Sequence, residues 1–148
     1  MKIKKNSGQS LFEVVVAIGI SALVVTGIVA VASNSIQNSS YSKDKNVATN
    51  YVQETMEWMR QERDKNLANF KLKITESVGM VYCLPALSAW PVPTSKCSDS
   101  QVIPNTKFVR KLEFPEYTTN VVRAKATVTW KDAKGTHEVS SSTDLSLK

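Results

Sequence analysis

The sequence predicts an α+β protein in which a long N-terminal helix, membrane-spanning in its first half, packs its second half on a small antiparallel sheet. Three observations lead to this fold class. Residues 14–32 carry no charge, residues 47–59 repeat apolar side chains every three or four positions, and residues 122–131 alternate apolar with polar side chains. The first pattern is typical of a membrane-spanning helix, the second of an amphipathic helix, and the third of a half-buried strand.

The uncharged run from Val14 to Ala32 is the longest apolar stretch of the chain. Its 19 residues would span roughly 28 Å as a helix, close to the hydrocarbon thickness of a bilayer. Lys2, Lys4 and Lys5 precede the run, and no comparable cluster follows it. The positive-inside rule therefore predicts a cytoplasmic N-terminus, with the rest of the chain on the far side of the membrane.

One carboxylate, Glu13, stands at the entrance to this run. An ionisable group beside lipid is costly and needs a partner. If the chain is cut between Gly8 and Gln9, Gln9 gains an α-amine that is largely protonated near neutral pH. Glu13 lies four residues later, on the same helix face, and we expect it in the first turn, where the helix dipole favours negative charge. Glu13 would then pair with its own amine or with that of a neighbouring chain, and an intermolecular pair would set the stagger of adjacent subunits.

These residues carry a family resemblance. Gly8, Ser10, Leu11, Phe12 and Glu13, followed by Val-Val-Val-Ala, resemble the N-terminus of type IV prepilins and type II secretion pseudopilins. The continuation after the glutamate is most similar to minor pilins of the V and I types, and weaker similarity covers residues 47–66 and 121–148. The resemblance implies a pilin-like fold, cleavage after Gly8 by an inner-membrane prepilin peptidase, methylation of the new N-terminus at Gln9, and neutralisation of a neighbour's amine by Glu13. Gln9 stands where the family usually has phenylalanine.

Other interpretations of the N-terminal segment stay open. Ala30-Val31-Ala32 fits the small-x-small pattern of a signal peptidase site, which would release a soluble exported protein after Ala32. Against this, the apolar run exceeds the ~7–15 residues of a signal-peptide core, and a signal peptide has no need of Glu13. A plain single-pass anchor, or a carboxylate that is simply solvated at a helix N-terminus, is the remaining alternative.

We divide the chain into four parts: a leader peptide at 1–8, a transmembrane and assembly helix at 9–32, an amphipathic continuation at 33–66, and a globular β-rich head at 67–148. Helix is expected through the Ser- and Asn-rich residues 33–42 because a helix that is already nucleated propagates more easily than a new one starts. The apolar face that follows is expected to pack on a sheet rather than to hold a cofactor. It consists of Val47, Ala48, Tyr51, Val52, Thr55, Trp58 and Met59.

Strands dominate the predicted head. Phe70, Leu72 and Ile74 alternate with lysines, which predicts a short strand or a linker. Further strands are expected at 80–84 and at 108–114, the second of them ended by Pro115. The region between them, 85–104, contains four prolines and reads as an irregular loop.

The clearest strand is the alternating segment at 122–131. Its apolar positions are expected to face the core, and they are Val122, Ala124, Ala126, Val128 and Trp130. Asp132-Ala133-Lys134-Gly135 then predicts a type I turn with glycine at positive φ, so that a hairpin returns through His137 and Val139.

Cys83 and Cys97 are the only cysteines. In an exported protein an even pair predicts a disulfide, which here would close the proline-rich loop and add about 3 kcal/mol of stability. A zinc site is not indicated, because two distant cysteines and the single His137 do not make a ligand set. We expect neither a metal nor another cofactor.

No catalytic arrangement is evident, and we expect a structural protein rather than an enzyme. The partners implied are other pilin or pseudopilin subunits, the prepilin peptidase and the inner membrane, followed by residence in a pilus or secretion pseudopilus. The alternative is a DNA-uptake pilin that binds nucleic acid through a basic head surface. That surface would comprise Lys107, Lys111, Arg123, Lys125, Lys131 and Lys134. The formal charge of +6 falls to +3 without the three leader lysines, so the mature protein is only weakly basic.

Overall fold

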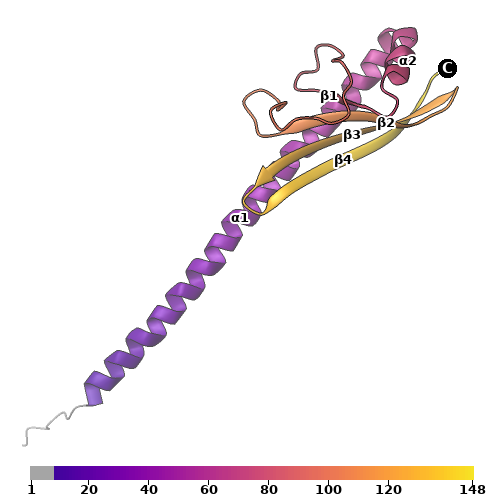
Figure 1. Ribbon diagram of the computed structural model, residues 1–148. Helices are drawn as coiled ribbons and strands as arrows, with labels where there is room; N and C mark the ends of the chain where they lie inside the picture. The colour runs from indigo at the N-terminus through magenta and orange to yellow at the C-terminus, as the bar shows by residue number, and fades with distance from the viewer. Residues whose placement is uncertain (1–8) are drawn as a thin grey trace, which may run out of the picture. The chain divides into compact units, whose positions relative to one another are not determined.

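The computed structural model describes residues 9–148, with side chains from Leu11 onward. Four strands form one antiparallel sheet in the order β1-β2-β3-β4, and two helices precede them. The elements are α1 (Gln9–Lys65), α2 (Leu67–Glu76), β1 (Val81–Cys83), β2 (Val109–Tyr117), β3 (Val121–Asp132) and β4 (Gly135–Ser146) (Figure 1). The expected α+β class, with a long N-terminal helix on a small antiparallel sheet, is confirmed.

The chain falls into two compact units, one ending at Lys43 and the other beginning at Asp44. Helix is unbroken through residues 33–42, as expected, although serine and asparagine are poor helix formers. The second unit contains the later part of α1 and the whole sheet, and it has its own hydrophobic core.

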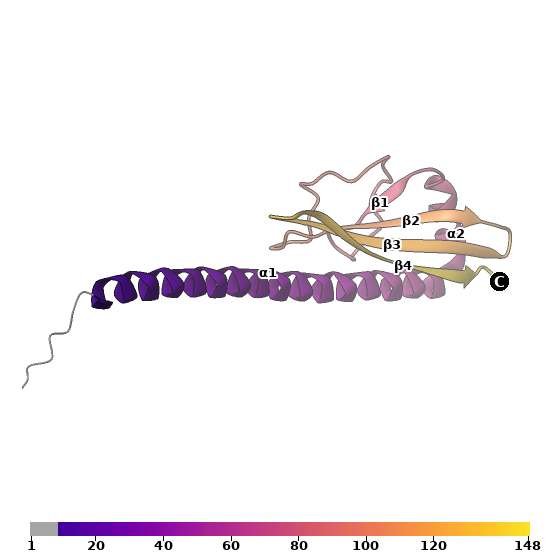
Figure 2. The same ribbon diagram turned by 90° about the horizontal axis from the view of Figure 1, so that it is seen from below.

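The core of the second unit lies between the later part of α1 and one face of the sheet, which run alongside one another (Figure 2). From α1 it takes Ala48, Val52, Thr55, Met56, Trp58 and Met59, all buried. The predicted strand pattern is confirmed, because the five apolar positions of β3 are at most 2% exposed. Thr55 is buried at no polar cost, since its hydroxyl donates to the carbonyl of Tyr51 at 2.7 Å.

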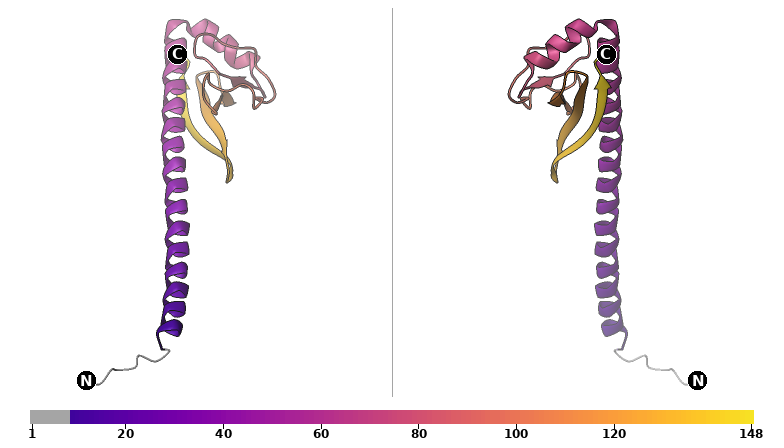
Figure 3. Two further views of the ribbon diagram at one scale, coloured as in Figure 1. Left: turned by 90° about the vertical axis from the view of Figure 1, so that its left-hand side faces the viewer. Right: turned by 90° about the vertical axis from the view of Figure 1, so that its right-hand side faces the viewer.

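The prediction of a strand or linker at 70–74 is wrong, because these residues lie in α2. Phe70 and Ile74 lie one helical turn apart and are both 1% exposed, whereas Leu72 between them is 59% exposed. The apolar side chains therefore follow the i, i+4 spacing of a helix. The side chain of Asn66 caps the helix by accepting from the backbone N–H of Asn69 at 2.9 Å. Figure 3 shows α2 turning away from the end of α1.

Pro115 does not end its strand as expected. The strand β2 runs on to Tyr117, and its register with β3 shifts between Glu113 and Glu116. A bulge of this kind gives one strand extra residues that need no ladder partner, so a proline without an N–H is tolerated there. The predicted hairpin between β3 and β4 is confirmed, with Asp132 paired to Gly135, whose φ is 131°.

The predicted disulfide between Cys83 and Cys97 is present, with 5.5 Å between the two Cα atoms. The loop that it closes is irregular, as expected, but it is anchored by Trp90. The Trp90 ring lies 4.7 Å from that of Trp58 and 4.9 Å from that of Tyr82, and its Nε1 donates to Glu62 at 3.0 Å. The loop is thus held to α1 and β1 by contacts that are independent of the sulfur atoms.

Candidate membrane and assembly segment

The first part of α1 is a helix with exposed side chains along its length. Every side chain from Leu11 to Ser40 is exposed. No charged residue lies between Glu13 and Lys43, a distance of about 45 Å along a helix. That length matches a bilayer together with its interfacial regions.

Large apolar side chains surround this part of the helix on all sides. They are Leu11, Phe12, Val14, Val15, Val16, Ile18, Ile20, Leu23, Val24, Val25, Ile28, Val29, Val31 and Ile36. A helix that is apolar all round needs an apolar environment, because water contact with so much hydrocarbon is unfavourable. The helix is long and apolar enough to cross a membrane.

The two hydroxyl groups within the apolar run are satisfied by the helix itself. Ser21 donates to the carbonyl of Ala17 at 2.7 Å, and Thr26 donates to the carbonyl of Leu23 at 2.9 Å. Neither side chain therefore requires water, which allows both to face lipid or another helix. The sequence alone shows only that these residues are polar. Serine and threonine in a helix can donate to a carbonyl three or four residues earlier, and this local rule explains how both hydroxyl groups are satisfied.

The structure places Glu13 one helical turn from Gln9, because residues 9–13 are all helical. The prediction that Glu13 lies in the first turn is wrong. A turn takes about 3.6 residues, so the fifth residue begins the second turn, and the first turn contains no acid. Of the motif, Leu11 and Phe12 are exposed and Ser10 is helical, whereas Gly8 and the leader lie outside the described residues.

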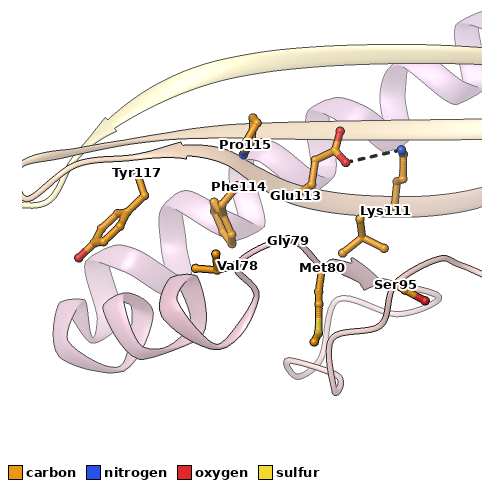
Figure 4. A pocket seen from close by; sticks show the side chains of 10 residues that line it. Val78, Gly79, Met80, Ser95, Lys111, Glu113, Phe114, Pro115 and Tyr117 are labelled. Carbon is orange, nitrogen blue, oxygen red and sulfur yellow. Dashed lines mark ion pairs between the residues drawn. The ribbon is translucent and has the colours of Figure 1, made fainter.

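Basic residues of the head form ion pairs with acids of the second unit. The ion pairs are Lys107–Asp44 at 2.6 Å, Lys111–Glu113 at 3.7 Å (Figure 4), Arg123–Asp144 at 2.8 Å, Lys125–Glu113 at 3.5 Å and Lys131–Asp99 at 2.5 Å. The hydrogen bond from Arg123 lowers the pKa of Asp144, and that from Lys131 lowers the pKa of Asp99. A surface whose cations are already paired has little free charge to offer to phosphates.

His137 belongs to the end of the β3–β4 hairpin. Its Nε2 lies 2.9 Å from a carboxylate oxygen of Asp132, and its ring lies 5.4 Å from that of Trp130. The bond with His137 lowers the pKa of the Asp132 carboxyl. Among residues 9–148, no three histidine, cysteine or acidic side chains gather in a way that could hold a metal ion.

Arg110 is a structural residue that the sequence reasoning missed. It is 3% exposed, and its Nε donates to the carbonyl of Leu84 at 2.9 Å. Its guanidinium also lies 3.5 Å from Glu54 and 5.9 Å from the centre of the Tyr51 ring, so it joins β2 to α1. Burial lowers the pKa of Arg110. The sequence does indicate this burial, because side chains alternate between the two faces of a strand and residue 110 therefore lies on the same face as buried Leu112.

No protein-family model, curated protein or solved structure matches this chain. The features on which a function can be argued are therefore physical ones. They are the exposed apolar helix, the acid at its entrance, and a disulfide-closed head whose charges are largely paired.

Proposed function

We propose that this protein is a minor type IV pilin or pseudopilin. In this proposal it is a structural subunit that is inserted in the inner membrane, cleaved after Gly8 by a prepilin peptidase, and assembled into a pilus or secretion pseudopilus. The observation that carries the proposal is the position of Glu13, one helical turn after Gln9 on an apolar helix whose side chains are exposed.

The chemistry of assembly follows from the cost of a charge in an apolar environment. Glu13 has apolar residues on both sides, so packing this helix among others removes water from its carboxylate. A buried carboxylate is tolerated when a cation pairs with it. Cleavage before Gln9 supplies that cation as an α-amine, and the amine of a neighbouring subunit meets the carboxylate at a defined stagger. An uncut chain lacks the amine, so assembly depends on processing.

Two further features support an exported, membrane-anchored subunit. The internal hydrogen bonds of Ser21 and Thr26 let the helix contact lipid without unsatisfied hydroxyl groups. The Cys83–Cys97 disulfide is typical of a compartment outside the reducing cytoplasm. Both agree with a cytoplasmic N-terminus and a head on the far side of the inner membrane, before transfer to the cell surface in a filament.

The test is a comparison of Glu13→Gln with Glu57→Gln in the native host. Both changes remove one negative charge from α1, but Glu57 is an exposed residue whose partner is Arg60 at 3.5 Å. We expect Glu13→Gln to reach the membrane at normal levels, yet to enter sheared filaments at least about tenfold less, because the paired charge is lost. Glu57→Gln should behave as the parent protein. Normal amounts of the Glu13 variant in filaments would contradict the proposal.

Intact mass of the mature protein separates this function from a secreted protein and from a plain anchor. An N-terminus at Gln9 agrees with assembly, and an added methyl group on it agrees with methylation. An N-terminus at Ser33 would indicate a secreted protein instead. A chain that still begins at Met1 would indicate a plain anchor.

A further inference from the structure

The part of α1 that follows the apolar run buries none of its side chains. Every side chain from Ser33 to Ser40 is exposed, whereas the part of α1 at 48–59 contributes buried side chains to the core of the second unit. The boundary between the two compact units falls soon after this stretch, between Lys43 and Asp44. Helix at 33–40 therefore gains little from the packing of side chains in a core.

The composition of the same stretch does not favour a helix. Of the residues at 33–40, only Ile36 and Gln37 are neither serine nor asparagine. Serine and asparagine side chains hydrogen-bond nearby backbone groups in non-helical conformations, so both residues rank well below alanine as helix formers. The stretch carries no charge, so no pair of opposite charges four residues apart compensates within it.

The helix on either side of this stretch is more firmly held. Residues 14–32 form the apolar run, and in a bilayer their backbone groups would find no water to bond when a helical hydrogen bond opens. At 48–59, opening the helix would expose the buried side chains of the core to water. At 33–40, in contrast, an opened backbone group exchanges its helical partner for a water molecule at little net loss.

We propose that residues 33–40 are a hinge in α1, a stretch that unwinds and re-forms in water while the helix on each side stays intact. Each opening frees the backbone dihedral angles of the stretch, so the direction of α1 after the hinge becomes independent of its direction before it. A head joined in this way can turn while the apolar run stays in the membrane. The inference rests on the membrane location in the proposed function, but not on cleavage or filament assembly.

Amide hydrogen exchange of the full-length chain in lipid nanodiscs, measured by mass spectrometry, tests the unwinding. Protection factors at 33–40 should be at least about 100-fold lower than those at 14–32 and at 48–59, because only the hinge opens without the rest of the helix. Equal protection at 33–40 and 48–59 would overturn the hinge. Low protection at 14–32 would instead contradict the membrane location on which both proposals rest.

Alanine substitutions test whether composition is the cause of the opening. The triple change Ser33→Ala, Ser35→Ala and Ser39→Ala should raise the protection factors at 33–40 about tenfold, because alanine is the better helix former. Asn46→Ala together with Asn50→Ala is the control, since both residues are exposed on the later part of α1. The control should leave protection at 33–40 unchanged. No rise in the triple variant, or an equal rise in the control, would refute the argument from composition.

A distance across the hinge tests whether the two parts of α1 change direction. Spin labels on p-acetylphenylalanine at Val29 and Gln53 stand before and after the hinge at exposed positions, and this amino acid adds no cysteine that could exchange with the disulfide. A continuous helix would separate the two backbone positions by about 36 Å. Pulsed electron resonance should give a broad distribution reaching well below this value for the parent, and a single narrow distance for the triple variant. A single narrow distance in the parent, or equally broad distributions in both proteins, would overturn the proposal.

Discussion

Replacing both Cys83 and Cys97 by serine tests what holds the head together. The two cysteines are 14 residues apart in sequence, and the chain-entropy model gives about 3 kcal/mol for closing a loop of that size in the unfolded state. The native loop should keep its place without the disulfide, because Trp90 and Thr94 anchor it through other contacts. We therefore expect a loss of about 3 kcal/mol and a fall in Tm of about 10–20 °C, with the native packing of Trp90 unchanged at low temperature.

The assay is thermal unfolding of the full-length chain in detergent, followed by near-ultraviolet circular dichroism, with and without reductant. The parent protein should melt like the serine variant once thiol titration shows that its disulfide is reduced. The variant should be indifferent to reductant. Equal melting of parent and variant under oxidising conditions would refute the stabilising role of the disulfide. Loss of the tryptophan signal from the cold variant would refute the independent anchoring of the loop.

Three further predictions concern the interior of the head. Burial raises the pKa of Tyr82 to about 12, whereas an unfolded tyrosine titrates near about 10. Tyr82 therefore contributes roughly 2–3 kcal/mol to the free energy of unfolding below about pH 10, and this contribution is lost between about pH 10 and 12. Urea titrations of Tyr82→Phe should lack this alkaline loss. Arg110→Met should lower the free energy of unfolding, measured in urea, by about 1–3 kcal/mol, since it removes the donor to the buried Leu84 carbonyl. Glu54→Gln should lower it by less, because Glu54 is mostly exposed. Equal losses in the two variants would contradict this interpretation. Trp90→Phe should lower the free energy of unfolding by about 1 kcal/mol through loss of the bond to Glu62. Trp90→Ala should lower it by about 2 kcal/mol more, since a half-buried aromatic contact is lost as well. Similar losses in the two variants would show that ring packing contributes little.

The sequence predicts those elements in which one physical effect dominates. Residues 14–32 must be helical in an apolar environment whatever follows them, and the alternation at 122–131 has a single solution as a half-buried strand. Residues 70–74 fit both a strand and a helix. Apolar residues at every second position are typical of a strand, but two of these three, Phe70 and Ile74, are also one helical turn apart. The capping side chain of Asn66 and the packing of Phe70 in the core decide for the helix. Pro115 was misjudged because a bulge depends on the neighbouring strand and is not visible in one segment.

The candidate site likewise has some features that the sequence predicts and others that it does not. Spacing alone places Glu13 one turn after Gln9, because that relation is local to a helix. The ion pairs of the head join residues as far apart as Lys107 and Asp44, and the contact of Trp90 with Glu62 joins different elements. Such relations arise from how the strands and loop are stacked, so no local pattern reveals them. For this reason the sequence does not show which acids pair with the basic residues of the head.

The glycines of the apolar helix complete the argument for a partner outside the chain. A Cβ added at Gly19 or Gly27 would meet nothing within 4 Å, so neither residue is required by the packing of the described chain. Each nevertheless weakens the helix by about 1 kcal/mol relative to alanine. Small residues on a membrane helix allow a neighbouring helix to approach closely. The exposed apolar surface, the acid at its entrance and these two glycines are all unfavourable or unused in the isolated chain, and the helix packing that we propose, in a membrane and then a filament, would give each of them a role.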